Sequence, residues 1–362
     1  MSAARSLEKN STPSTECAPP TPSAVTAISL TEVSSLQSGG ATRVSMDSTK
    51  NCPLGEMRPV IVVTGPTASG KSAYALEIAR QFNGVVINAD SMQVYKGLRI
   101  LTARPTPDEE AQVPHKLYGW LEPEDVCSAG RWVQAALAEI KKCHDSGLTP
   151  IICGGTGFYI EALIKGLPPA PSIPPDIRAQ ARLDVAKDYE SYYSVLERAD
   201  PKSAARIHDP QRLSRALEIW RTTGKIPSEA LDTPPVPPKD LVFNVTAIMP
   251  ERDQLYARIN SRTNIMANLG AVEEATAFLA RNLNPELPAM RAIGVKEFAS
   301  VNKSEILLQN AIEATSQATR RYAKRQNTWI KQRLEVDFVL NMEENVNLHD
   351  DFIIKLYKKL LT

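Results

Sequence analysis

The sequence predicts an α/β fold, in which a parallel sheet is flanked by helices on both faces and carries a small helical insertion. Short apolar runs such as "PVIVV" (59–63) lack the polar alternation of a half-exposed strand, so we expect them to be buried on both faces. Amphipathic helical segments separate these runs, and this alternation is typical of parallel sheets. Two proline clusters interrupt the pattern and mark the insertion.

The first strands and helices are expected in one core unit over residues 57–170. The unit contains buried strands at 84–90 and 149–155 and an amphipathic helix at 129–143. A further helix is expected at 72–82, directly after a glycine-rich loop. Residues 1–56 are rich in Ser, Thr, Pro, Ala and Gly without helical periodicity, and we predict that they form a disordered extension.

The rest of the chain divides at the proline clusters "GLPPAPSIPP" and "DTPPVPPKD". Proline interrupts helices, and the segment between the clusters has a wholly helical pattern. We therefore predict that residues 171–235 form a helical insertion and the return of the chain to the core. The second part of the core spans 236–340, with a strand at 241–249 and then helices, of which 259–282 is the longest stretch. A tail helix is expected at 341–362.

The loop "GPTASGKS" matches the phosphate-binding pattern G-x-x-x-x-G-K-[ST]. This pattern lies between a strand and a helix, as in the P-loop NTPase-like fold, and is shared with ATP-binding and other nucleotide-binding proteins. Backbone N–H groups and the helix dipole would hold a di- or triphosphate, with a lysine on the phosphates and Ser72 on Mg²⁺. The predicted phosphate-binding residues are Gly65, Pro66, Thr67, Ala68, Ser69, Gly70, Lys71 and Ser72.

Asp90 ends the second strand, where the carboxyl ends of parallel strands face the ligand crevice. It could bind a metal or an acceptor alcohol, act as a general base, or cap a helix beginning near Ser91. From position alone, the functional acid and the cap are equally good interpretations.

The segment "ATRRYAKRQNTWIKQR" (318–333) carries six basic residues and no acid. Helical spacing puts Arg321, Lys324, Arg325 and Thr328 on one side, and Tyr322 and Trp329 on another, where we expect them to pack. Since the whole chain is nearly neutral, with 42 Lys and Arg against 41 Asp and Glu, this one-signed run favours a polyanion partner over a merely solvated face.

Composition excludes several classes of protein. No apolar run approaches the length of a membrane span, so no membrane attachment is predicted. The five cysteines form no C-x-x-C pair, which argues against a zinc site or a disulfide framework. We expect a cytoplasmic protein that works as a monomer.

Taken in order, these blocks resemble the tRNA dimethylallyltransferase (isopentenyltransferase) family of the bacterial type. The similarity covers about 59–333 and rests on "GPTASGKS", "NADSMQVYKG", "VPHKLYG", "CGGTGF", "DPQRLSRALEIW", "RAIGVKE" and "ATRRYAKRQNTW". It implies transfer of a dimethylallyl group from dimethylallyl diphosphate to N6 of adenosine 37, beside the anticodon, with Mg²⁺ and the anticodon stem-loop as partners.

The resemblance also implies roles for individual residues. The implied catalytic residues are Asp90 as general base, with Thr67, Lys71 and Arg262 at the diphosphate. The implied tRNA-contacting residues are Asp90, Ser91, Met92, Gln93, Thr156, Arg178, Gln211, Arg212, Leu213, Ser214, Arg215, Arg291, Lys296, Arg321, Lys324, Arg325 and Thr328.

The chain departs from the family pattern in places that remove no implied catalytic group. The usual "GTAKP" reads "LTARP", with Leu101 and Arg104, and the turn "RIHDPQR" is two residues shorter than usual. Three alternatives stay open. They are a small-molecule kinase with ATP in the loop, an isopentenyltransferase that uses free AMP or ATP, and a non-enzymatic RNA-binding protein with a vestigial loop.

Overall fold

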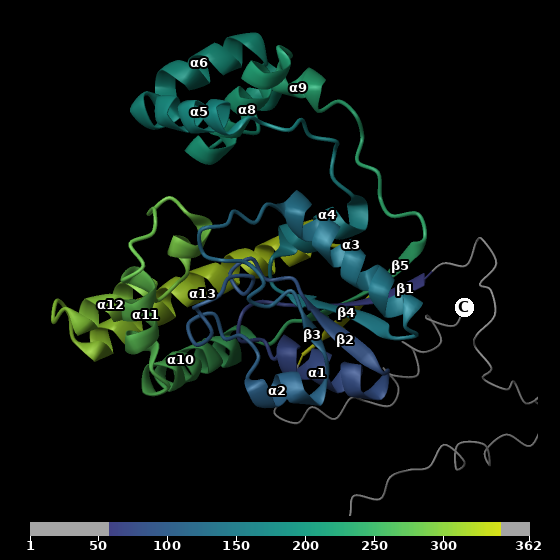
Figure 1. Ribbon diagram of the computed structural model, residues 1–362, viewed down its shortest axis with the longest axis vertical. Coiled ribbons are helices and arrows are strands. Elements are labelled where there is room, and N and C mark those ends of the chain that lie inside the picture. The colour runs from purple at the N-terminus through teal and green to yellow at the C-terminus, as the bar shows by residue number, and fades with distance from the viewer. Residues whose placement is uncertain (1–57, 342–362) are drawn as a thin grey trace, which may run out of the picture. The chain divides into compact units, whose positions relative to one another are not determined.

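The structure of the protein is a computed structural model that describes residues 58–341 (Figure 1). The expected extension over 1–56 and, apart from its first residue, the expected tail helix over 341–362 lie outside the described residues. Within the described range, no helix is both long enough and apolar enough to cross a membrane.

A six-stranded sheet forms the centre of the described chain, with the strand order β3-β2-β4-β1-β5-β6. Every neighbouring pair of these strands is parallel, which confirms the predicted fold class. The strands are β1 (Arg58–Thr64), β2 (Gly84–Asn88), β3 (His115–Lys116), β4 (Thr149–Gly154), β5 (Leu241–Ile248) and β6 (Phe338–Leu340).

Eight helices of the described chain lie outside the insertion, and Figure 1 shows helices on both sides of the sheet. Before the insertion these are α1 (Lys71–Gln81), α2 (Pro107–Gln112), α3 (Ala129–Asp145) and α4 (Gly157–Lys165). After the insertion they are α10 (Arg252–Asn268), α11 (Ala271–Leu279), α12 (Val295–Asn302) and α13 (Leu308–Arg333).

Successive residues of the central strands point into different cores, as the side-chain period of two in a strand requires. On β1, Val60 and Val62 pack in one cluster with Trp132 of α3. Ile61 and Val63 pack in the other with residues of α1. Both faces of the strand are therefore buried, which is why its sequence shows no polar alternation.

The expected long helix over 259–282 is broken, and this part of the prediction is wrong. α10 ends at Asn268, and α11 begins at Ala271 after Gly270. Gly270 has φ of 102°, in the left-handed region that ends a helix and that glycine adopts without strain. α13, with 26 residues, is the longest helix of the described chain.

The sequence did not predict the edge strands β3 and β6, which have two and three residues. Such runs are too short to show a period. The position of β6 is set by tertiary bonds, since Asp337 accepts from Val245 N–H through its carboxylate at 2.7 Å and donates its own N–H back to the Val245 carbonyl.

Between the proline clusters the described chain is helical, as predicted. Its own apolar core contains Leu196, Leu213 and Leu217. The division of the chain into separate units at 171–235 stays a prediction. The helices of this segment are α5 (Pro175–Lys187), α6 (Tyr189–Ala199), α7 (Pro201–Ala204), α8 (Pro210–Thr223) and α9 (Pro227–Ala230).

Candidate active site

The glycine-rich loop connects β1 to α1 at the carboxyl edge of the sheet. Gly65 has φ of 153°, and a Cβ there would lie 2.5 Å from the carbonyl oxygen of Ile248. Gly70 has φ of 96° and precedes α1, whose first residue is Lys71. The loop therefore brings the N-terminal end of an 11-residue helix, with its positive dipole, to the edge of the sheet.

Thr67 is the point where two distant helices reach this loop. Arg262 of α10 donates from Nη2 to Thr67 Oγ1 at 2.6 Å. Gln326 of α13 accepts from the Thr67 N–H through Oε1 at 2.8 Å. Arg258, one turn before Arg262, donates to the Ser69 carbonyl at 3.3 Å. The conformation of the loop therefore depends on residues that lie 189 to 259 positions downstream.

The electrostatics of the loop are dominated by two cations and one acid. Burial lowers the pKa of Lys71, Cys153 and Asp90 oppose that change, and the positive charge of Arg262 adds to it. Burial also lowers the pKa of Arg262, again opposed by Asp90. Asp90 is thus close enough to influence both cations. Two partly desolvated cations at a helix N-terminus make a site that favours a polyvalent anion.

Hydrogen bonds of both its side chain and its backbone hold Asp90 in place. Its Oδ1 accepts from the N–H groups of Met92 at 2.9 Å and Gln93 at 3.4 Å. Its own N–H donates to Asn88 Oδ1, while the Asn88 amide donates to the Asp90 carbonyl. The expected helix near Ser91 is absent, and Asp90 caps a turn instead. Within the described chain no group donates to Oδ2, so the capping role leaves one carboxylate oxygen available for chemistry.

Thr156 links the turn at Asp90 to the end of β4. Its Oγ1 accepts from the Ser91 N–H at 2.9 Å and donates to Ser91 Oγ at 3.3 Å. The Gln93 amide is engaged within the protein, since Nε2 donates to the carbonyls of Thr102 and Ala103. Residues 90–93 are therefore fixed by hydrogen bonds on both sides of the turn.

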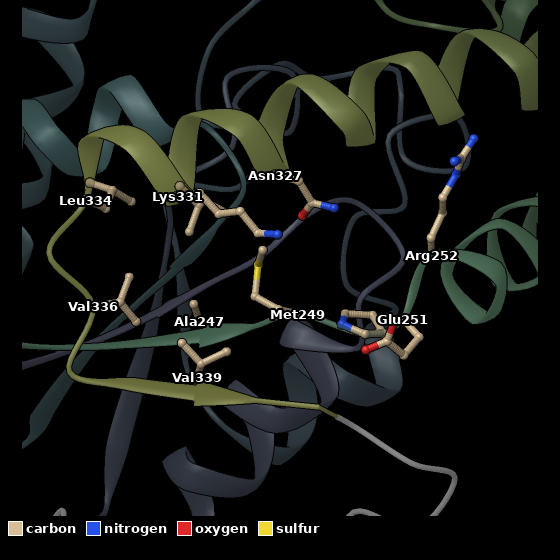
Figure 2. A pocket seen from close by; sticks show the side chains of 11 residues that line it. Ala247, Met249, Glu251, Arg252, Asn327, Lys331, Leu334, Val336 and Val339 are labelled. Atoms are coloured by element: carbon tan, nitrogen blue, oxygen red, sulfur yellow. The ribbon is translucent and has the colours of Figure 1, made fainter.

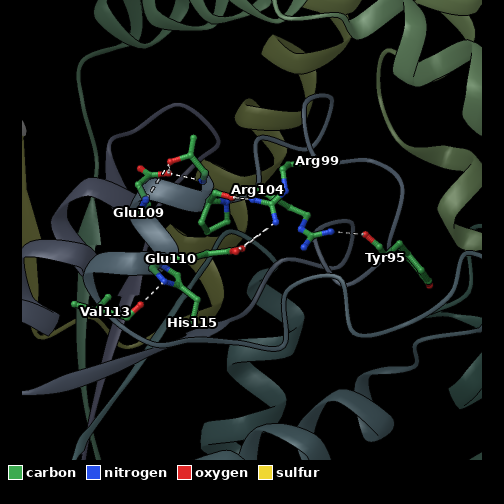
Figure 3. Close-up of polar contacts among 9 residues, drawn as sticks. Tyr95, Arg99, Arg104, Glu109, Glu110, Val113 and His115 are labelled. Atoms are coloured by element: carbon green, nitrogen blue, oxygen red, sulfur yellow. Dashed lines mark hydrogen bonds and ion pairs between the residues drawn. The ribbon is translucent and has the colours of Figure 1, made fainter.

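The segment that carries the "LTARP" departure is stabilised by its own polar contacts (Figure 3). Arg99 pairs with Glu110 of α2 at 3.2 Å. Arg104 donates from Nη1 to the Tyr95 carbonyl at 3.4 Å, and its guanidinium occupies the space where a side chain at position 119 would be. The glycine of "VPHKLYG" thus leaves room for the arginine that replaces the usual lysine.

The basic side of α13 is exposed as the spacing predicted. Arg321, Lys324 and Thr328 are exposed, and neither cation pairs with a carboxylate among the described residues. Arg325 lies over the ring of Tyr322 at 5.5 Å. Tyr322 and Trp329 are half-buried, in agreement with the expectation that they pack.

The other predicted tRNA-contacting residues have different environments. Gln211 and Arg212 on α8 and Arg291 and Lys296 near α12 are exposed, and Arg178 and Arg215 are half-buried. Leu213 is fully buried in the core of the insertion, and Ser214 donates to the Pro210 carbonyl. The side chain of Leu213 therefore cannot face a ligand, because the helical period turns it inward.

Sequence reasoning assigned no role in this site to Tyr322, Tyr118 or Gln326. The Tyr322 hydroxyl interacts with the side chains of Thr156 and Gln326, and burial, together with Asp90, raises its pKa. Burial, then Cys153 and Asp90, raise the pKa of Tyr118. The signal that was available is a polar residue, Gln326, on the apolar side of a helix between Ala323 and Ile330.

A cavity of about 540 Å³ lies between the last two turns of α13 and the ends of β5 and β6 (Figure 2). Its wall combines apolar side chains such as those of Leu334 and Val336 with the polar side chains of Glu251, Arg252, Asn327 and Lys331. None of the predicted site residues lines it. Its position below α13 puts it outside the group of residues around Thr67 and Asp90.

The site suits a divalent cation only together with a phosphate ligand. Ser72 is exposed on the first turn of α1, and its side chain interacts with the Cys153 thiol. Among residues 58–341, no group of three or more His, Cys, Asp or Glu side chains is placed to hold a metal ion. Phosphate oxygens would therefore have to complete the coordination, as is usual for Mg²⁺.

Comparisons with known proteins agree with this geometry. The family model described as IPP transferase matches residues 93–333. A tRNA dimethylallyltransferase of Rhodospirillum rubrum is 46% identical over 290 residues, which are 78% of this chain and 88% of that protein. The crystal structure of a tRNA isopentenylpyrophosphate transferase of Bacillus halodurans has a TM-score of 0.60 at 31% identity, covering 84% of this chain and 96% of that one. A eukaryotic dimethylallyltransferase acting on tRNA has a TM-score of 0.70 at 27% identity, covering 84% and 79%.

Proposed function

Since this chain belongs to the IPP transferase family, we propose that it transfers a dimethylallyl group from dimethylallyl diphosphate to N6 of adenosine 37 in tRNA, releasing diphosphate. The observation that carries the proposal is the position of Asp90, close enough to Lys71 and Arg262 to oppose the lowering of the pKa of both. A base beside two phosphate-binding cations fits a reaction in which an amine attacks carbon and a diphosphate departs.

The residues around the loop stabilise the leaving group. An allylic C1 develops positive charge as its bond to oxygen breaks, and the diphosphate gains negative charge. Lys71 and Arg262 are partly desolvated, which makes their attraction to that charge stronger than in water. Thr67 holds Arg262 in position through the 2.6 Å hydrogen bond.

Asp90 accepts the proton that N6 loses as the C–N bond forms. The exocyclic amine of adenine is a weak nucleophile, so removal of its proton in the transition state assists attack, typically by ~10²–10⁴-fold. Two backbone N–H groups hold Oδ1, and Oδ2 is the oxygen assigned to the proton. The adenine must leave its stack to reach this oxygen.

We assign the remaining roles in line with this reaction. Mg²⁺, the proposed metal, would be held by Ser72 and the diphosphate oxygens and would neutralise charge on the leaving group. The exposed cations of α13 contact the tRNA backbone, with the exposed residues of α8 and α12 as further contacts. Monomeric assembly and a cytoplasmic location stay predictions.

The test uses the purified full chain with Mg²⁺ and labelled dimethylallyl diphosphate. Label should appear in an anticodon stem-loop that contains adjacent adenosines. Transfer to free AMP but not to the stem-loop would favour the isopentenyltransferase alternative. Transfer of label from the γ-phosphate of ATP to a small alcohol would favour the kinase. Absence of transfer with intact RNA binding would favour the non-enzymatic alternative.

A further inference from the structure

Gln326 is a buried polar residue on the helix that carries the exposed cations. Its exposed fraction is 5%, and both ends of its amide are bonded. Oε1 accepts from the Thr67 N–H at 2.8 Å, and Nε2 donates to the Gly155 carbonyl at 2.8 Å. Burial of an amide is costly unless donor and acceptor are both satisfied, so this side chain has one well-defined orientation.

The backbone around Gln326 is shaped to receive it. A Cβ on Gly155 would overlap the Gln326 amide nitrogen and would lie 3.1 Å from the Gly65 carbonyl oxygen. The start of the phosphate loop, the end of β4 and α13 therefore meet at one point. Gly155 has no positive φ, so its backbone conformation does not require glycine. Glycine is required there because the Gln326 amide approaches so closely.

The exposed face of α13 is rigidly connected to this contact. Lys324, Arg325 and Thr328 lie within two positions of Gln326 on a continuous helix. Tyr322, one turn earlier, interacts with both Gln326 and Thr156, and Thr156 in turn accepts from the N–H of Ser91, the residue after Asp90. A displacement of the basic face would therefore shift the phosphate loop and the segment that holds the base.

From this arrangement we propose that Gln326 is a positioning residue that couples RNA binding on α13 to diphosphate binding in the loop. The proposal deepens the proposed function and rests on it for the identity of the two ligands. Gln326 touches neither ligand and acts through Thr67. Each ligand favours the same placement of α13 against the loop, so each should bind more tightly when the other is present, and by the same factor.

The experiment measures that factor directly. Calorimetry gives the affinity of the full chain for Mg²⁺-pyrophosphate with and without an anticodon stem-loop, and for the stem-loop with and without pyrophosphate. In the wild type we expect each ligand to tighten the other at least about 5-fold, the lower end of typical coupling. In Gln326→Met, which keeps length and removes both bonds, the factor should fall toward 1, and kcat should fall about 10- to 100-fold because the reacting groups are misplaced. KM for the stem-loop at saturating dimethylallyl diphosphate should rise by no more than the lost coupling factor, because the variant keeps the exposed cations of α13.

The controls separate positioning from folding. Gln332→Met alters an exposed glutamine on the same helix and should leave the coupling factor and kcat unchanged. If Gln326→Met lowers the folded fraction seen by circular dichroism, Gly155→Ala displaces the amide from the opposite side and should give the same loss of coupling. A wild-type factor of 1, or an unchanged factor in the folded variants, would overturn the inference. The two proposals can also separate. If the wild type shows coupling that the variants lose, but transfers no dimethylallyl group, the inference is supported and the proposed function is refuted.

Discussion

Arg262 on α10 donates to the Thr67 hydroxyl in the phosphate loop at 2.6 Å, across 195 positions of sequence. The bond connects the second half of the core to a loop that follows the first strand. It also turns the guanidinium toward the region where Lys71 and Asp90 influence one another. An arginine so placed completes an anion site that the loop motif alone would leave with one cation.

A double-mutant cycle on this pair tests the arrangement. Arg262→Ala and Thr67→Val should each lower kcat/KM for dimethylallyl diphosphate, and the double variant should lose less than the product of the two effects, because residues in contact are not additive. Arg252→Ala, on the same helix and exposed, is the matched control with near-normal activity. Strict additivity would show that the hydrogen bond has no role in catalysis.

Asp90→Asn should abolish most of the transfer while preserving the local fold. Asparagine keeps an oxygen that accepts from Met92 and Gln93 but cannot take the N6 proton. We expect kcat to fall ~10²–10⁴-fold, with the affinity for the stem-loop nearly unchanged. Single-turnover transfer of labelled dimethylallyl to the stem-loop measures this. A rate like that of the wild type would rule out Asp90 as the base.

Phosphate affinity should weaken as the solution becomes alkaline. Burial lowers the pKa of Lys71 below its ordinary value of 10.5, so the ammonium loses its proton at a lower pH than a solvated lysine. As pH rises through that lowered pKa, the affinity for pyrophosphate should decrease about tenfold per pH unit. Lys71→Arg retains its charge and should show a flatter profile over the same range. Parallel profiles for the two proteins would contradict the assignment.

Removal of the cations on α13 should weaken RNA binding in a salt-dependent way. In Arg321→Ala, Lys324→Ala and Arg325→Ala, the slope of log affinity against log salt should fall by about 1 for each lost phosphate contact. Lys141→Ala removes an exposed lysine of α3 that pairs with Asp145, and should leave the slope unchanged. Filter binding of a labelled stem-loop over a salt series measures it. If the slope in all three variants equals that of the wild type, the RNA binds elsewhere on the protein.

Trp132→Phe should destabilise the fold next to the site without altering its charge. The indole N–H donates to the Asn88 carbonyl at 2.7 Å, and the ring, fully buried, stacks on Tyr159. Phenylalanine leaves that carbonyl unsatisfied and the space partly empty, a loss of about 1–3 kcal/mol. Denaturant unfolding followed by circular dichroism measures it. An unchanged unfolding midpoint would mean that the hydrogen bond contributes nothing to stability.

Local pattern was sufficient wherever one physical constraint acts on consecutive residues. The apolar runs at 59–63 and 149–155 must be buried on both faces, and they became neighbouring strands β1 and β4. The glycines of the loop and the period of α13 likewise follow from backbone geometry. The break at Gly270 was missed because a single glycine inside an amphipathic pattern does not show whether the helix tolerates it or ends there.

The sequence by itself determined the parallel sheet, the phosphate loop, the acid after the second strand and the exposed basic side of one helix, since each is a property of adjacent or periodic residues. Only the tertiary structure decided that Arg262 and Gln326 meet on Thr67, and that Gly155 is a glycine because an amide from α13 occupies its side-chain space. These are contacts between segments far apart in the chain. Their geometry depends on how the helices pack against the sheet, and no local pattern of residues records that packing.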